Sequence, residues 1–95
     1  MILGAALMLT VPAFAHEEMR VIGTIAAQKG KVIEVKTKDG KTAHITLDDQ
    51  TGITRDKAAI PASELKTGVY VVIDGLGDDI SDLSAIQIRI VPPPK

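Results

Sequence analysis

Ile33-Glu34-Val35-Lys36-Thr37-Lys38-Asp39-Gly40-Lys41-Thr42-Ala43-His44-Ile45 is the stretch of sequence that decides the fold. Apolar and polar residues alternate on both sides of Lys38-Asp39-Gly40, and a period of two indicates half-buried β-strands. The glycine in the middle of the stretch is typical of a hairpin turn. The stretch therefore predicts two antiparallel strands joined by a short loop.

The length of that loop follows from the alternation. A two-residue turn at Asp39-Gly40 would pair Val35 with His44 and mix polar and apolar residues on one face. A three-residue loop, with Gly40 in the left-handed conformation, keeps all apolar residues on one face. We therefore predict the pairs Val35–Ala43, Ile33–Ile45 and Glu34–His44.

A near copy of the turn, Gln28-Lys29-Gly30-Lys31, precedes the first strand of this hairpin. The same three-residue rule predicts that Ile25 pairs with Ile33 and Gly23 with Val35, which extends the hairpin to a three-stranded meander. Gly23 lies in the middle of its strand, where a glycine is typical of a bend or bulge.

The second half of the chain begins with a polar segment, residues 48–67, that Gly52 and Pro61 interrupt. Residues 62–66 could form one or two helical turns, with Leu65 as an apolar plug and Gly68 as the end of the segment. A strand at 69–73, an acidic loop at 74–82 and a last strand at 85–91 follow. Ile86, Ile88 and Ile90 are expected on one apolar face, and the prolines at 92–94 end the sheet.

This order predicts an all-β fold, a small five-stranded OB-like barrel with a short helical turn between its third and fourth strands. An SH3-like barrel is the alternative. The chain has no cysteine, so a domain of this size needs a closed and well-filled core. We expect the barrel at residues 16–91 and a proline-rich tail at 92–95.

Residues 1–15 carry no charge and end in Ala13-Phe14-Ala15, directly before the polar His16-Glu17-Glu18. The apolar run is shorter than the about 20 residues that span a bilayer, and the pattern predicts a secretory signal peptide cleaved after Ala15. A buried strand or helix is the alternative. Signals begin with a basic residue, but the first one here is Arg20, so we expect the start to lie upstream. The mature chain would be periplasmic or secreted, without a transmembrane span.

Four segments carry a family resemblance: Gly23-Thr24-Ile25, the segment at 33–41, Ser63-Glu64-Leu65-Lys66-Thr67-Gly68-Val69-Tyr70-Val71-Val72, and Ala85-Ile86. Together they resemble a family of small exported bacterial domains, domain of unknown function 5666. The resemblance spans nearly all of the mature chain and is carried by turn glycines and core aliphatic residues. It implies an OB-like envelope domain without an assigned activity, and it implies no catalytic residues.

Composition argues against nucleic acid as the partner. The net charge is −1, and the mature chain has a single aromatic residue, Tyr70, whereas nucleic-acid-binding OB-folds need a basic groove and several aromatic platforms. The phase of Tyr70 predicts a ring on the outer face of the sheet or at a barrel end.

Metal binding has one candidate site at the new amino terminus. Cleavage after Ala15 would expose the terminal amine and imidazole of His16 beside Glu17 and Glu18, a set that can chelate copper or nickel. A solvated terminus is the alternative. The predicted register places His44 across from Glu34, which favours an ion pair over metal ligation. The acidic runs at 48–49 and 78–82 suggest calcium but lack the ligand pattern of an EF-hand, so solvated turns are the simpler interpretation.

We therefore expect an exported, non-catalytic β-barrel that binds an envelope protein or a small ligand, and no cofactor. The first alternative is a periplasmic metal-handling protein of copper type that uses His16. A small hydrolase is a more distant alternative, because Ser63, Ser81 and Ser84 lie in turns or loops without a histidine nearby in the sequence.

Overall fold

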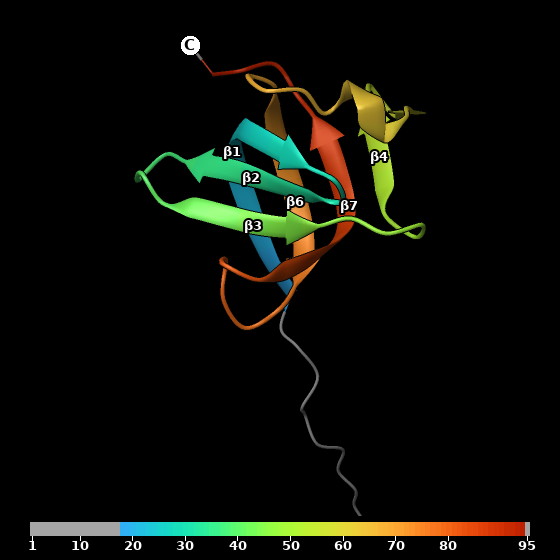
Figure 1. The fold of residues 1–95 in the computed structure, drawn as a ribbon. Helices are drawn as coiled ribbons and strands as arrows, with labels where there is room; N and C mark the ends of the chain where they lie inside the picture. Colours follow the sequence, from blue (N-terminus) through green and yellow to red (C-terminus); the bar gives the residue numbers. More distant parts are fainter. Residues whose placement is uncertain (1–17, 95) are drawn as a thin grey trace, which may run out of the picture.

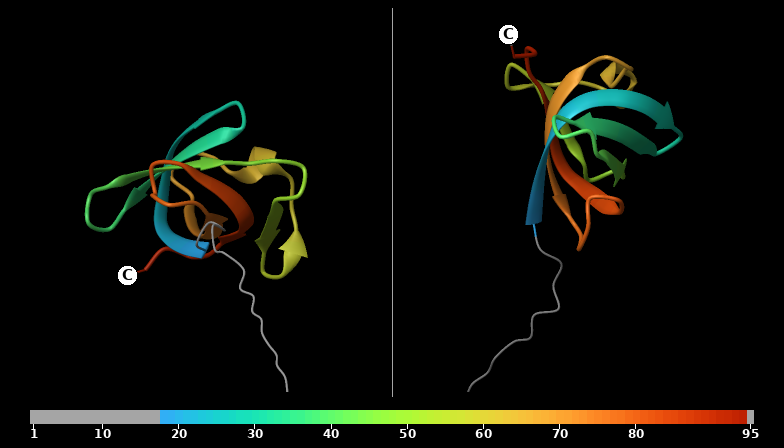
Figure 2. Two further views of the ribbon diagram at one scale, coloured as in Figure 1. Left: turned by 90° about the horizontal axis from the view of Figure 1, so that it is seen from below. Right: turned by 90° about the vertical axis from the view of Figure 1, so that its left-hand side faces the viewer.

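The computed structural model describes residues 18–94, which form one sheet that curls into a barrel (Figure 1, Figure 2). The order of the strands is β3-β2-β1-β6-β7-β4-β5, and an additional parallel pairing between β3 and β7 closes the barrel. The strands are β1 (Glu18–Lys29), β2 (Val32–Thr37), β3 (Thr42–Thr46), β4 (Gly52–Arg55), β5 (Ala58–Ala59), β6 (Tyr70–Leu76) and β7 (Leu83–Ile90).

The five long strands β1, β2, β3, β6 and β7 are those of the predicted OB-like barrel, so the predicted fold class is confirmed. The hairpin of β2 and β3 has the predicted register, with Glu34 opposite His44 and Val35 opposite Ala43. Gly40 has a φ of 85°, and Thr37 and Lys41 close the three-residue loop through a backbone hydrogen bond of 2.8 Å.

The register predicted between β1 and β2 is wrong by two residues. Ile25 pairs with Val35 and Gly23 with Thr37, because the turn consists of the two residues Gly30 and Lys31. A bulge between Ile25 and Ala27 then restores the phase, so that the side chains of Ile25 and Val35 still share the buried face.

Strand β1 pairs with two different strands along its length. Glu18–Thr24 pairs with β6, whereas Gly23–Lys29 pairs with β2, so both neighbours meet β1 at Gly23. A Cβ atom at Gly23 would overlap the carbonyl oxygen of Lys36, which explains why glycine is required there. The predicted bend at this residue therefore lies at the corner where the chain passes from one pairing to the other.

The acidic loop is shorter than predicted, because β6 continues through Leu76. The expectation that Ile86 shares the buried face of Ile88 is also wrong. A register shift near Asp74 leaves Ile86 without a pairing partner on β6, and its side chain is 40% exposed. Leu83, Ala85 and Ile88 are the buried residues of β7.

The polar segment between β3 and β6 contains structure that the sequence did not predict. β4 adds to β7 in parallel and forms a hairpin with β5. The helical turn is present as a 3-10 turn at Ala62–Glu64, and Leu65, directly after it, is completely buried. Leu65 is thus the plug that we predicted, and Gly68 follows with a φ of 94°.

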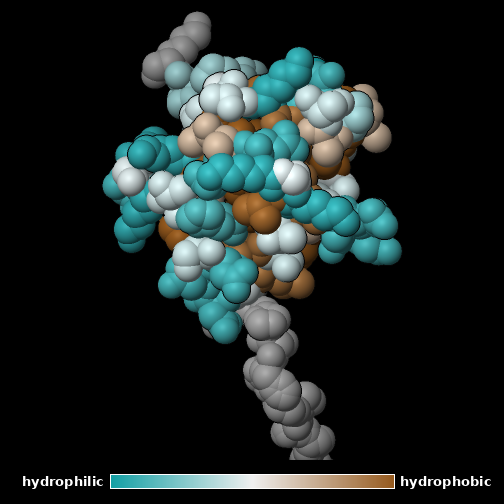
Figure 3. Space-filling model, in the orientation of Figure 1, coloured by the Kyte–Doolittle hydropathy of each residue, from teal (hydrophilic) through white to brown (hydrophobic). Residues whose placement is uncertain are grey.

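The interior is apolar throughout. Within residues 18–94, no polar or charged residue is buried. The largest fully buried side chains come from all five long strands and the plug: Ile25, Ile33, Ile45, Leu65, Ile73, Leu83, Ile88, Val35 and Val71. Figure 3 shows hydrophilic side chains covering most of the front of the barrel, with apolar side chains visible between them. The polar and charged side chains of residues 18–94 are therefore all at least partly exposed. The segment interpreted as a signal peptide, 1–15, lies outside the described residues.

Candidate binding groove beside strand β1

Two adjoining cavities line the outer side of β1 where it meets the β2–β3 hairpin. The first, of about 230 Å³, includes Ile22, Thr24, Tyr70 and Pro94 among its lining residues. The second, of about 350 Å³, lies between Arg20, Lys41 and Ile80. Ile22, Thr37 and Lys38 line both cavities, and we call the two adjoining cavities together the β1 groove.

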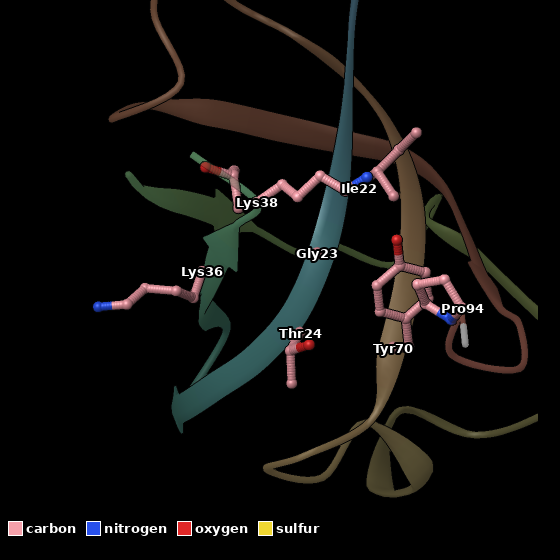
Figure 4. A pocket seen from close by; sticks show the side chains of 8 residues that line it. Ile22, Gly23, Thr24, Lys36, Lys38, Tyr70 and Pro94 are labelled. Carbon is pink, nitrogen blue, oxygen red and sulfur yellow. The ribbon is translucent and has the colours of Figure 1, made fainter. Parts of the chain in front are cut away.

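The apolar part of the groove comes from β1, β6 and the tail. Ile22 is 45% exposed, the highest value among the three exposed large aliphatic residues of 18–94, the others being Ile86 and Leu76. Figure 4 shows Tyr70 beside Pro94, with the side chain of Lys38 extending toward Ile22 and Lys36 pointing away. The Tyr70 ring lies on the outer face of the sheet, as its phase predicted.

The polar part of the groove is mainly cationic. Lys38 and Lys41 make no ion pair with any residue in 18–94, whereas Nε of Arg20 donates to Oδ1 of Asp74 over 2.9 Å. That hydrogen bond raises the pKa of Arg20 above its ordinary value. The carboxylate of Asp39 is engaged within the loop, where the Thr37 hydroxyl donates to it and lowers its pKa. The groove therefore presents positive charge beside an apolar floor.

Of the residues predicted to hold a metal at the new amino terminus, His16 and Glu17 lie outside the described residues. Glu18 is the first residue of β1, exposed and opposite Leu76. Among residues 18–94, no group of three or more His, Cys, Asp or Glu side chains is arranged to hold a metal ion.

His44 faces Glu34 as the register predicted. Its Nε2 lies 3.8 Å from Oε2 of Glu34, and Nζ of Lys29 lies 3.7 Å from the same oxygen. The other ring nitrogen, Nδ1, is shielded by protein and has no hydrogen-bond partner in the described part of the chain. One nitrogen therefore faces a carboxylate and the other is inaccessible, an arrangement that fits a surface ion pair better than a metal ligand.

The acidic runs form local turns. Oδ1 of Asp48 accepts a hydrogen bond from the backbone N–H of Gln50 over 2.7 Å. Oδ1 of Asp79 accepts from both the backbone N–H and the hydroxyl of Ser81, which lowers the pKa of Asp79. These bonds direct the carboxylates toward their own loops, as the solvated-turn interpretation predicted.

The groove itself was not predicted. Its one signal in the sequence is the density of lysines around the β2–β3 turn, at positions 36, 38 and 41. Arg20, Tyr70, Ile80 and Pro94 come from distant parts of the chain, and only the closed barrel brings them to the same depression.

The strand order, the shared first strand and the buried plug define this chain as an OB-like β-barrel domain. A crystal structure of CusF with silver(I) is similar to it, with a TM-score of 0.58 and 15% identity over 79% of this chain and 99% of that chain. At that identity the similarity shows the fold. Neither a family model nor a curated protein matches the chain. The resemblance to domain of unknown function 5666 stays a prediction. In residues 18–94, no helix is long and apolar enough to cross a membrane.

Proposed function

We propose that this chain is a non-catalytic binding module of the bacterial envelope and that the β1 groove is its contact surface. The observation that carries the proposal is the combination, in the β1 groove, of the exposed Ile22 with Lys38 and Lys41, which form no ion pair within residues 18–94. Asp39 and Asp79 attract Lys41 electrostatically without forming an ion pair with it. Exposed apolar surface next to unpaired charge is typical of a binding site. The uncharged segment 1–15 supports export.

The non-catalytic part of the proposal follows from how the polar groups are placed. Catalytic acids and bases are usually partly buried, with a pKa shifted by desolvation or by a close charge. Among the described residues, the shifted groups Arg20, Asp39 and Asp79 are exposed, and each shift comes chiefly from a hydrogen bond. This pattern supports binding rather than catalysis.

The test is an NMR titration of ¹⁵N-labelled residues 16–95 with soluble envelope extract. We expect shifted amides to cluster in the β1 groove and the shifts to disappear in the double variant Lys38→Glu/Lys41→Glu. Lys57→Glu/Lys66→Glu is the matched control, because it makes the same charge change away from the groove. Shifts that lie elsewhere, or that the two double variants lose equally, would contradict the proposal.

A metal-handling function is the second candidate, and the similarity to CusF with silver(I) favours it. Here the ligands would be the terminal amine and imidazole of His16, together with Glu17 and Glu18. Calorimetry with Cu²⁺ and with Ag⁺ on residues 16–95 tests this function. The affinity should fall strongly in His16→Ala and stay unchanged in His44→Ala. Equal affinities of His16→Ala and the unaltered chain would exclude the site.

A further inference from the structure

Within residues 18–94, strand β1 has an open edge along Glu18–Ile22. On one side, this segment pairs with β6 throughout. On the other side, β2 ends at Thr37, opposite Gly23, because the loop 38–40 turns the chain away. Figure 1 shows the β2–β3 hairpin extending outward past β1, with the first residues of β1 (blue) continuing below it. Among the described residues, the first part of β1 thus has a neighbouring strand on one side only.

The backbone groups that point to this edge can be identified. The N–H of Ile25 donates to the Val69 carbonyl over 2.9 Å, and the Ile25 carbonyl accepts from Gly68 over 2.8 Å, so both groups of Ile25 point toward the β6 side. Because successive residues of a strand alternate in direction, Arg20 and Ile22 point their N–H and C=O groups to the open edge. Such groups are a template for another strand.

The open edge also forms one wall of the cationic half of the β1 groove, the cavity of about 350 Å³. Lys38 and Lys41 lie across from the edge, with Asp39 as the only acidic residue in the lining of this cavity. The Asp39 carboxylate already accepts the Thr37 hydroxyl. A strand that enters here would therefore meet two lysines without ion pairs among the described residues, and the apolar side chains of Ile22 and Ile80.

We propose that the partner is an acidic, extended polypeptide segment that adds as a strand along Glu18–Ile22. This inference rests on the proposed function of the β1 groove. Its backbone pairs with Arg20 and Ile22, its carboxylates lie near Lys38 and Lys41, and an apolar side chain packs on Ile22. A second copy of this chain fits less well, because its own Arg20 and lysines would come to face the same charges.

The probe is the peptide Ac-Glu-Val-Glu-Val-Glu-NH₂, added to ¹⁵N-labelled residues 16–95. We expect amide exchange at Arg20 and Ile22 to slow by about tenfold or more when the peptide is saturating. The affinity should fall about tenfold or more in Lys38→Glu/Lys41→Glu and stay unchanged in Lys57→Glu/Lys66→Glu. The lysine counterpart, Ac-Lys-Val-Lys-Val-Lys-NH₂, should not bind.

Two N-methylated forms of the acidic peptide test the backbone pairing. One is methylated at both valines and the other at the central glutamate, and because strand residues alternate, one form must lose binding while the other keeps most of it. Equal binding of both forms, or binding that leaves the Arg20 and Ile22 amides unprotected, would overturn the inference. A free protein that is dimeric, with these amides already protected, would overturn it as well.

The outcome separates this inference from the proposed function. If the acidic peptide fails to bind but envelope extract still shifts the groove amides, the β1 groove is a binding site for another kind of ligand and only the strand-addition inference is wrong. If neither the peptide nor the extract affects the groove, both proposals are wrong.

Discussion

Gly23 shows how one residue can determine the shape of the barrel. Both β2 and β6 approach β1 at this position, and a methyl group there would overlap the Lys36 carbonyl. We expect Gly23→Ala to lower the free energy of unfolding by about 1–3 kcal/mol, since neither backbone can move without breaking its ladder. Gly52→Ala is the control, because its Cβ would meet only the movable end of Gln87. Urea denaturation measures both, and equal losses would contradict the close-approach argument.

Two aspartates link stability to pH. Hydrogen bonds from Thr37 and Ser81 lower the pKa values of Asp39 and Asp79 in the folded protein. A carboxylate with a lowered folded-state pKa stabilises the fold above its unfolded-state pKa of about 4, and this contribution is lost as the pH falls through the folded-state value. The chain should therefore lose stability between about pH 5 and pH 3, and Asp39→Asn/Asp79→Asn should reduce that loss.

The measurement for the aspartate pair is urea denaturation at pH 6 and at pH 3. Asp49→Asn serves as the control, since the Asp49 side chain makes no hydrogen bond within residues 18–94 and its removal should leave the pH dependence unchanged. If the double variant kept the full pH dependence of the unaltered chain, the two hydrogen bonds would not be its source.

At the scale of elements, the β4–β5 hairpin has an unfavourable turn. Asp56 and Lys57 have φ angles of 51° and 70°, the conformation of a two-residue turn that favours asparagine followed by glycine. Lys57→Gly should stabilise the domain by about 1 kcal/mol and raise the melting temperature by several degrees. Lys57→Ala removes the same charge without relieving the backbone, so thermal unfolding should show no gain. Equal melting temperatures for the two variants would contradict the turn argument.

The elements also differ in how well their sequence predicted them. The hairpin of β2 and β3 was predictable because alternation and Gly40 allow only one consistent register. Between β1 and β2, the turn contains two residues instead of three, and the bulge between Ile25 and Ala27 hides the change, because the buried face keeps its phase. The short strands β4 and β5 were missed because β4 is stabilised by pairing with β7, which is distant in sequence.

At the scale of the whole molecule, stability depends on filling the barrel. Leu65 is completely buried and comes from outside the long strands, so its truncation leaves a cavity in the interior of the barrel. We expect Leu65→Ala to cost about 2–5 kcal/mol, measured by denaturation of residues 16–95. Ile86→Ala, at a side chain that is 40% exposed, should cost much less. Similar losses for the two variants would show that Leu65 does not plug the barrel.

The sequence by itself determined the fold class, the β2–β3 register, the plug at Leu65 and the pairing of Glu34 with His44, because each depends on local alternation or on a single turn. Only the tertiary structure decided the β1–β2 register, the exposure of Ile86 and the β1 groove with its open edge. The physical reason is that bulges shift the phase of a strand without changing its composition, and that a groove exists only where residues distant in sequence are brought together by barrel closure.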